Sequence, residues 1–237
     1  MVKRIALIGA AGAGKSTLVF SFSKFLEKRG LNVACVNLDP GCRHIKYPAV
    51  YDVRRDFSLD EIMKRHDLGP NAALKRIYES LVSKRTVGDA VSKSGKPDIV
   101  LLDTAGSLEL FLLGSVSHSL SGIADAVLFV CDSQSVSDDE DASVLRAINA
   151  IQRLKYALPT LTVVNKSDVL EKKAKSLKQH RLGAKGEGGF GAVDEHLENL
   201  LLEIGRREKL VFVSAVERSG FSDLHDAINE LFCECGE

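Results

Sequence analysis

A glycine-rich segment near the N-terminus restricts the folds that this chain can adopt. Residues 9–17 read GAAGAGKST, follow the apolar run of residues 5–8 and lead into a helical pattern. A G-x-x-x-x-G-K-S sequence between a strand and a helix is typical of a phosphate-binding P-loop. The alternative is a glycine-rich turn that binds nothing, which the complete motif in this context disfavours. We therefore predict a nucleotide-binding α/β protein.

The P-loop supplies the first candidate binding residues. Its glycines let successive backbone N–H groups face one anion, and the helix that begins near Ser16 adds its positive dipole end. Lys15 is predicted to reach the β- and γ-phosphates, and the Ser16 hydroxyl to ligate Mg²⁺. The nucleotide-binding residues predicted from this segment are Gly12, Ala13, Gly14, Lys15, Ser16 and Thr17.

Two further apolar runs each lead into an aspartate. Residues 33–38 precede Asp39, and residues 99–102 precede Asp103. Open parallel sheets bind ligands at the carboxyl ends of their strands, so both carboxylates are expected beside the P-loop. Asp103 has the form of a Walker B aspartate that helps to hold Mg²⁺, and Gly106 lets the backbone approach the γ-phosphate. Asp39 is a candidate for Mg²⁺ or for the attacking water, or else a turn-forming aspartate before proline.

A further buried run, residues 161–164, leads into the sequence N-K-S-D. Asn-Lys-x-Asp after a buried strand is the guanine-reading motif of GTPases. The Asp168 carboxylate can accept hydrogen bonds from N1–H and the 2-amino group of guanine, which adenine cannot offer. One more run, residues 210–213, ends where GTPases place a backbone N–H against the guanine oxygen. The predicted base-binding residues are Asn165, Lys166, Asp168, Ser214 and Ala215.

Helical patterns occupy most of the chain between these runs. Residues 43–56 hold no clear periodicity and fit a switch loop. A short helix is expected after Ser58, with Glu61 completing a capping box. A longer amphipathic helix follows, for which Asn71 could serve as N-cap, and another is expected to begin at Ser137. We therefore expect a P-loop NTPase fold, with helices on both faces of a mostly parallel sheet.

The chain is expected to form a single domain, residues 1–237, with a variable insertion around residues 171–193. This insertion is first Lys-rich and then Gly-rich, and fits either a mobile solvated loop or a partner-binding element. A final amphipathic helix is expected to pack against the sheet.

Composition narrows the functional classes. The chain has 32 basic and 32 acidic residues, so no overall charge favours nucleic acid or an anionic membrane, and we expect neither as a partner. No apolar run has the length of a membrane span, and the first strand leaves no room for a signal peptide. The 5 cysteines fit a reducing compartment rather than a disulfide framework. The expected location is cytoplasmic.

Taken together, the motifs resemble those of the GPN-loop GTPases, and most closely the short archaeal members. The shared motifs lie in the family's order and span most of the chain. They are the P-loop, N-L-D-P at 37–40, D-V-R at 52–54, G-P-N at 69–71, the Walker B segment through Leu108 and Glu109, and N-K-S-D at 165–168.

The resemblance implies a Mg²⁺-dependent GTPase that converts GTP to GDP and phosphate as a homodimer. It implies that the Gly-Pro-Asn loop of each protomer reaches into the other's nucleotide site, where Asn71 would sense or position phosphate. Eukaryotic relatives are implicated in the assembly and import of RNA polymerase, so RNA polymerase subunits or another large complex are the expected clients. The catalytic residues implied are Lys15, Asp39, Asn71, Asp103 and Gly106, and the Mg²⁺ ligands are Ser16, Asp39 and Asp103.

The sequence departs from the family where the Walker B segment ends. Ser107 stands where the family carries the glutamine that could orient the attacking water. Asp39 is then the strongest candidate to hold that water. A nucleotide-gated scaffold that does not hydrolyse GTP is therefore the rival hypothesis.

Cysteine and histidine residues raise a third possibility, a metal-transferring GTPase. Cys42 and His44 lie in the expected switch loop, and Cys233 and Cys235 lie near the C-terminus. Two protomers could supply a Cys₂His₂ set suited to Zn²⁺ or Ni²⁺. Spacing within one chain forms no closed tetrahedral site, so small, partly buried thiols are the preferred interpretation.

Overall fold

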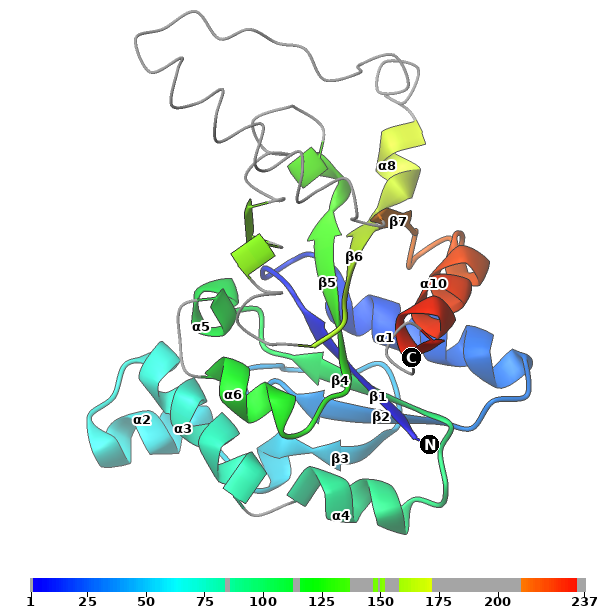
Figure 1. Ribbon diagram of the computed structural model, residues 1–237. Helices are drawn as coiled ribbons and strands as arrows, with labels where there is room; N and C mark the ends of the chain where they lie inside the picture. Colours follow the sequence, from blue (N-terminus) through cyan, green and yellow to red (C-terminus); the bar gives the residue numbers. More distant parts are fainter. Residues whose placement is uncertain are drawn as a thin grey trace, which may run out of the picture.

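The computed structural model describes residues 2–83, 86–112, 116–136, 147–148, 150–151, 158–171 and 210–233. A seven-stranded sheet lies at its centre, in the order β3-β2-β4-β1-β5-β6-β7, and the ladders between its strands are parallel (Figure 1). The α/β P-loop NTPase fold expected from the sequence is confirmed.

The strands are β1 (Lys3–Ile8), β2 (Val33–Leu38), β3 (Ala49–Asp52), β4 (Ile99–Thr104), β5 (Ala126–Asp132), β6 (Thr160–Asn165) and β7 (Leu210–Phe212). The helices are α1 (Lys15–Lys28), α2 (Leu59–His66), α3 (Pro70–Ser83), α4 (Thr86–Lys93), α5 (Leu108–Leu112), α6 (Val116–Ser121), α8 (Ser167–Glu171) and α10 (Phe221–Cys233), with 3₁₀ turns η1 (Val53–Arg55) and η2 (Ser133–Val136).

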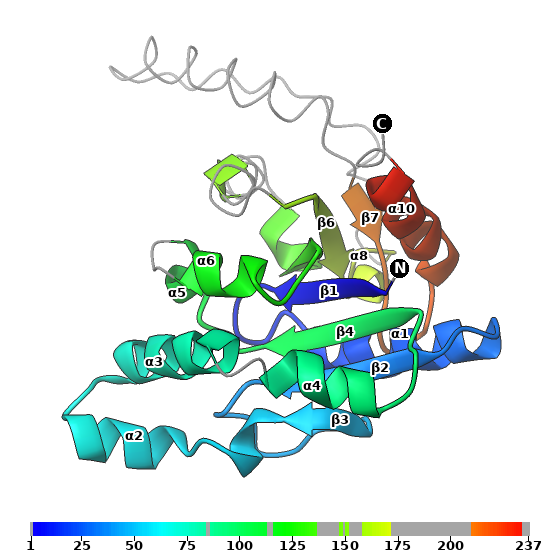
Figure 2. The ribbon, with the colours of Figure 1, turned by 60° about the horizontal axis from the view of Figure 1, so that its bottom comes forward.

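Two apolar clusters cover the two faces of the sheet. Alternate residues of β1 divide between them: Ile5 and Leu7 join the cluster that includes α1 and α10, whereas Ala6 and Ile8 join the cluster that includes α3, α4 and α6. Figure 2 shows these two groups of helices on opposite sides of the sheet. Strands buried on both faces explain the nearly continuous apolar runs in the sequence.

The register of the central strands brings their carboxyl ends together. Leu7 of β1 and Asn37 of β2 both lie opposite Asp103 of β4. The P-loop that follows β1 and the segments that follow β2 and β4 therefore leave the sheet at the same edge. This edge is where an open parallel sheet binds its ligand.

Residues 43–56 are less irregular than the sequence suggests. The prediction of a continuous loop is wrong for its second half, which contains β3 and η1. β3 has only four residues, pairs with β2 alone, and the ladder shifts register between Cys35 and Val36. A strand this short at the edge of a sheet leaves too little periodicity to be recognised in the sequence.

The helix starts give one confirmation and one correction. Ser58 caps α2, because its hydroxyl accepts the Glu61 N–H at 3.3 Å. Asn71 does not cap α3, which begins one residue earlier at Pro70. Proline fits the first helical position because its φ is already helical and its missing N–H would have no partner there. The first hydrogen bond of the helix then runs from Ala73 N–H to the Gly69 carbonyl, at 3.0 Å.

Other elements were missed or lie outside the description. Helices α4, α5 and α6 correspond to no prediction. Three features from the sequence analysis lie outside the described residues. They are the start of the helix expected at Ser137, the residue Cys235, and all but the first residue of the 171–193 insertion. Among the helices that are described, none combines the length and the apolar character needed to cross a membrane.

Candidate functional site

The P-loop folds around the side chain of its own lysine. Gly12 and Gly14 have φ angles of 82° and 90°, which favour glycine, and α1 begins directly afterwards at Lys15. Lys15 is only 6 % exposed, and its Nζ donates to the carbonyls of Gly9 and Ala10 at 2.9 and 3.0 Å. Burial lowers the pKa of Lys15, and the carboxylates of Asp103 and Asp39 partly offset this effect. The ammonium group therefore lies near enough to both predicted catalytic carboxylates to interact with them electrostatically.

A second motif packs directly against the P-loop. The Asn165 side chain donates to the Ala13 carbonyl at 2.9 Å and accepts the Ala215 N–H at 3.0 Å. A Cβ on Gly14 would lie 2.4 Å from the Asn165 amide nitrogen, so a larger residue there would displace Asn165. One buried amide thus joins the expected phosphate-binding loop to the segment expected to contact the base. Three segments far apart in the sequence form one site.

The expected base-reading carboxylate is held by a neighbouring hydroxyl. The Ser214 hydroxyl donates to Asp168 Oδ1 at 2.5 Å and accepts the Glu217 N–H at 3.1 Å. Lys166 has a positive φ of 63°, and its ammonium lies 3.5 Å from Asp132 at the end of β5. Asp168 is half-buried, so its free lone pairs remain accessible to a ligand.

Asp103 combines deep burial with an incomplete set of hydrogen bonds. It is 1 % exposed, and its Oδ2 accepts the Tyr47 hydroxyl at 2.7 Å. Within the described part of the chain, its Oδ1 has no hydrogen-bond partner. Burial raises the pKa of Asp103, while the nearby hydroxyls of Ser16 and Tyr47 and the Lys15 ammonium lower it.

These groups fit a magnesium ion that is completed by substrate. A buried carboxylate oxygen without a partner needs a cation or a donor, and Ser16 and Asp39 supply oxygen atoms nearby. Mg²⁺ commonly takes only one or two carboxylates and completes its shell with phosphates and water. Among the described residues, no group of three or more His, Cys, Asp or Glu side chains is suited to hold a metal ion by itself.

Asp39 follows β2 and is held by local hydrogen bonds. Its N–H donates to Asn37 Oδ1 at 3.1 Å, and its Oδ1 accepts the Gly41 N–H at 2.9 Å. The turn-forming role considered for this aspartate is therefore present. Because the turn uses only Oδ1, this local structure does not prevent Oδ2 from holding a water molecule.

Gly106 closes the site from the side of β4. A Cβ added there would lie 2.8 Å from the Ala11 Cα, so only glycine lets this segment rest against the P-loop. Contact with the P-loop is therefore a structural reason for a glycine at this position. Its approach to the γ-phosphate stays a prediction.

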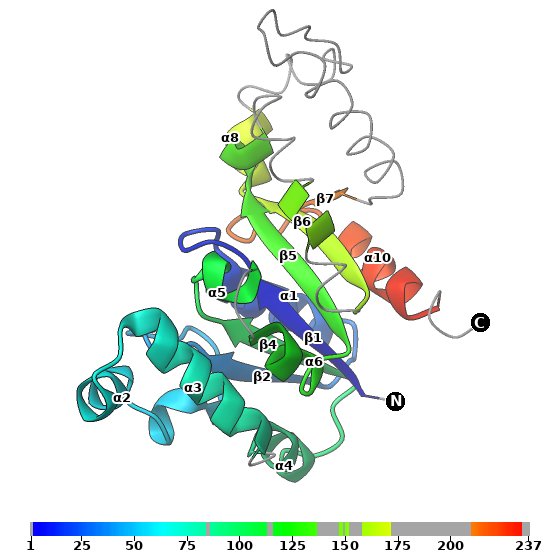
Figure 3. The same cartoon turned by 60° about the vertical axis from the view of Figure 1, so that its left-hand side comes forward.

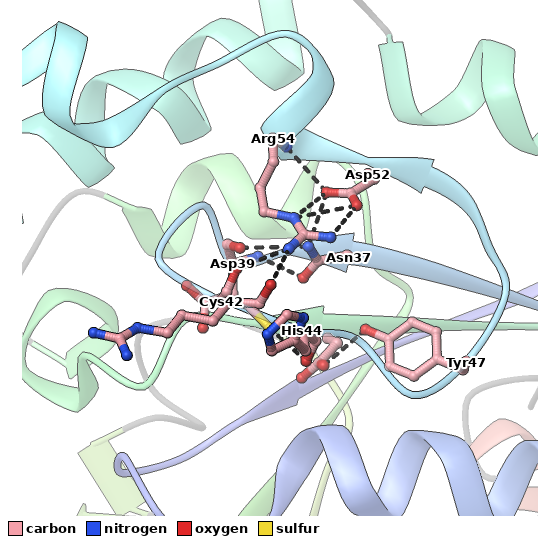
Figure 4. A network of polar contacts seen from close by, with 9 residues as sticks. Asn37, Asp39, Cys42, His44, Tyr47, Asp52 and Arg54 are labelled. Atoms are coloured by element: carbon pink, nitrogen blue, oxygen red, sulfur yellow. Dashed lines mark hydrogen bonds and ion pairs between the residues drawn. The ribbon is translucent and has the colours of Figure 1, made fainter.

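A polar network that the sequence did not identify holds the segment after Asp39. The Arg54 guanidinium binds Asp52, with Nη2 2.6 Å from Oδ2, and donates from Nη1 to the carbonyls of Cys42 and Arg43 at 2.8 and 3.0 Å (Figure 4). Asn37 also donates to Asp52, at 2.9 Å. These contacts lower the pKa of Asp52 to about 2. Asp52 and Arg54 lie in the D-V-R motif, the only signal that could have pointed to them.

Among the described residues, Asn71 lies apart from this site, and the predicted cysteines and His44 form no metal-binding group. Asn71 is exposed in the first turn of α3, and in Figures 1 and 3 the connection between α2 and α3 lies away from the dark-blue loop between β1 and α1. Cys42 donates from Sγ to the His44 carbonyl at 3.2 Å rather than pairing with the imidazole. Cys233 is exposed at the end of α10.

Comparison with known sequence families gives a match over nearly the whole chain. A family described as "Conserved hypothetical ATP binding protein" matches residues 7–234. This range includes the P-loop, both acidic strand ends and the segment expected to read the base. The family's description names ATP, whereas the N-K-S-D motif favours guanine.

Individual relatives carry a more specific name. The GPN-loop GTPase PAB0955 of Pyrococcus abyssi is 28 % identical over 248 residues, which cover 98 % of each chain. GPN-loop GTPase 1 of Schizosaccharomyces pombe is 26 % identical, over 94 % of this chain and 67 % of the relative. The crystal structure of PAB0955, described as a GTPase in apo form, matches with a TM-score of 0.81 and 26 % identity, again over 98 % of each chain.

Proposed function

The chain belongs to the GPN-loop GTPase family, and from this premise we propose that it binds GTP and hydrolyses it to GDP and phosphate with Mg²⁺. The observation that carries the proposal is the position of Asn165. Its side chain contacts both the P-loop at Ala13 and the Ala215 N–H, so phosphate and base recognition meet at one buried amide.

The chemistry can be assigned to residues that already lie together. Lys15 and the backbone N–H groups of the P-loop hold the β- and γ-phosphates. Ser16 and Asp103 would hold Mg²⁺, which neutralises charge on the phosphate oxygens when bound. Asp39 would orient the attacking water, because Ser107 is too short to act where the family carries glutamine. This division of roles predicts slow hydrolysis.

The proposed preference for guanine rests on Asp168 rather than on the description of the matched family. The Ser214 hydroxyl holds Oδ1 at 2.5 Å and leaves the carboxylate free to accept further hydrogen bonds. Guanine offers N1–H and a 2-amino group to such an acceptor, whereas adenine offers neither. Bound adenine would leave the remaining acceptor positions of this carboxylate desolvated and without partners, which costs affinity.

Single-turnover hydrolysis tests the proposal. With protein in excess over γ-labelled GTP and Mg²⁺ present, we expect phosphate release that Lys15→Ala abolishes, and no release from ATP. Binding of GTP without any release over several hours would contradict hydrolysis. That outcome would favour the nucleotide-gated scaffold, which the serine at position 107 makes the second candidate.

We also propose that the active form is a homodimer in which Asn71 acts in trans. The support is the family membership and the exposed position of Asn71, which makes it accessible to a second protomer. A role in assembling a large complex, with RNA polymerase subunits as one candidate client, rests on the resemblance alone.

Mixed dimers test the trans arrangement. Homodimers of Asn71→Ala and homodimers of Lys15→Ala should each be nearly inactive. A mixed dimer contains one site with an intact Lys15 from one chain and an intact Asn71 from the other, so it should recover up to about half of the wild-type activity, one site of two. Verified mixed dimers with no recovery would contradict trans action, and wild-type protein that is monomeric with GTP would contradict the dimer itself.

A further inference from the structure

Tyr47 links the segment after β2 to the Walker B aspartate. Its hydroxyl donates to Asp103 Oδ2 at 2.7 Å, and the two residues are 3 % and 1 % exposed. Figure 4 shows Tyr47 at the right of the network, with its hydroxyl directed toward the other side chains drawn as sticks. The contact joins residues that are 56 positions apart in sequence. No role for Tyr47 was expected from the sequence motifs.

Packing fixes where the Tyr47 hydroxyl lies. The ring belongs to the apolar cluster that α1 forms with one face of the sheet, together with Cys35 and Leu101. A ring enclosed in a close-packed core cannot move its hydroxyl far without displacing neighbours. A phenol has an ordinary pKa of about 10, so at neutral pH the Tyr47 hydroxyl carries its proton and acts as the donor to Asp103.

The hydrogen bond from Tyr47 also makes the two carboxylate oxygens of Asp103 different from each other. Oδ2 is occupied by Tyr47, whereas Oδ1 is buried and has no partner within the described residues. Oδ1 is therefore the carboxylate oxygen that is left available to a cation. Fixing the orientation of a ligand in this way is what residues behind a metal site generally do.

The segment that carries Tyr47 is held at its other end as well. Arg54 donates to the carbonyls of Cys42 and Arg43, and Asn37 accepts the Asp39 N–H. The ten residues from Asp39 to Pro48 are thus anchored by Arg54 near the start and by Asp103 near the end. Asp39, expected to hold the attacking water, lies on the same anchored segment.

We propose that Tyr47 is a positioning residue for the magnesium site, acting through the orientation of Asp103. This proposal rests on the proposed function and deepens it. The Tyr47 hydroxyl holds Asp103 so that Oδ1 is the oxygen presented to Mg²⁺. Because the same hydroxyl anchors the segment after Asp39, the binding of Mg²⁺ and the conformation of that segment are coupled.

Tyr47→Phe tests the proposal, with Tyr51→Phe as the matched control. Tyr51 is also nearly buried, at 6 % exposed, and its hydroxyl donates to Asp56 at 2.9 Å, outside the site. We would titrate Mg²⁺ into each protein with fluorescent GDP, and would titrate Mn²⁺ with detection of free metal by electron paramagnetic resonance. Tyr47→Phe should raise the half-saturating metal concentration about 10-fold or more, the usual effect of losing a residue behind a metal ligand. Tyr51→Phe should leave it unchanged.

Binding of GDP in EDTA should be equal in the three proteins, because the hydroxyl has no role in holding nucleotide without metal. A half-saturating metal concentration for Tyr47→Phe within about twofold of wild type would contradict the proposal, since a hydrogen bond to a charged group is worth more than that. Wild-type GDP binding that does not respond to Mg²⁺ would instead contradict the proposed function. A shift of equal size in an Asp103→Asn background would show that Tyr47 does not act through Asp103.

A measurement on the unmutated protein makes the test independent of whether the variants fold. The chain has 4 tyrosines, so ¹³C labelling at their Cζ atoms gives a simple spectrum. Adding Mg²⁺ to the GDP complex should shift the Tyr47 signal, and Mn²⁺ should broaden it, while the Tyr51 signal stays in place. No change in any of the signals would overturn the proposal.

Discussion

Replacing Asp168 with asparagine should lower the affinity for GTP by about 100-fold or more and raise the affinity for xanthosine triphosphate. The substitution turns one acceptor oxygen into an amide donor, which opposes the N1–H and 2-amino donors of guanine. Xanthine carries a carbonyl in place of the 2-amino group, so the new amide can donate to it. Competition against a fluorescent GDP analogue, with GTP, XTP and ATP as competitors, measures the change.

Asp132→Asn is the matched control for this experiment. Asp132 is another aspartate at the carboxyl end of a strand and lies 3.5 Å from the Lys166 ammonium. Its substitution weakens an ion pair in the same region but removes no acceptor facing the base, so the order GTP over ATP and XTP should persist. Wild-type protein that binds ATP as tightly as GTP would contradict the assignment of guanine as the preferred base. It would instead support ATP binding, as in the description of the matched family.

Replacing Asp39 with alanine should abolish turnover, with a fall in the single-turnover rate of about 100-fold or more, while GDP affinity changes little. Asp39 is the remaining carboxylate placed to orient water, because Ser107 replaces the longer glutamine. Asp39→Asn refines the test, since its side-chain oxygen can still accept the Gly41 N–H that Oδ1 accepts at 2.9 Å. An equal loss in both variants would assign the effect to the charge rather than to the turn.

Ser107→Ala is the comparison that decides between the two candidates. Ser107 lies between Gly106, which rests on the P-loop, and the start of α5. If its hydroxyl orients the water, Ser107→Ala will slow hydrolysis more than Asp39→Ala does, and the assignment to Asp39 will be wrong. If neither substitution changes the rate, neither residue orients the attacking water and both assignments will be wrong.

Local chemistry was enough to predict the central motifs. Each of these motifs is an apolar strand followed directly by a few residues of characteristic type. They are the P-loop, the two acidic strand ends and the N-K-S-D segment. Continuous apolar runs predict strands buried on both faces, and parallel strands place their carboxyl ends at one edge. The α/β fold and the family followed from these patterns.

Short elements and helix starts were predicted less well. β3 is recognised only by its pairing with β2, and α3 begins at Pro70 rather than after Asn71. β3 is defined by a contact with another strand, whereas the start of α3 follows from the fixed φ of Pro70, which the choice of Asn71 as cap did not take into account. The Ser58 cap was predicted correctly because its hydrogen bond to Glu61 spans only three residues.

The sequence by itself determined which residues are expected to bind phosphate, read a base and ligate Mg²⁺, because these expectations depend on residue type and on spacing within one short segment. Only the tertiary structure decided how they cooperate. Asn165 reaches Ala13 across 152 positions, and Tyr47 reaches Asp103 across 56. Such contacts depend on strand order and register, which bring distant segments to one edge of the sheet, and no local pattern encodes them.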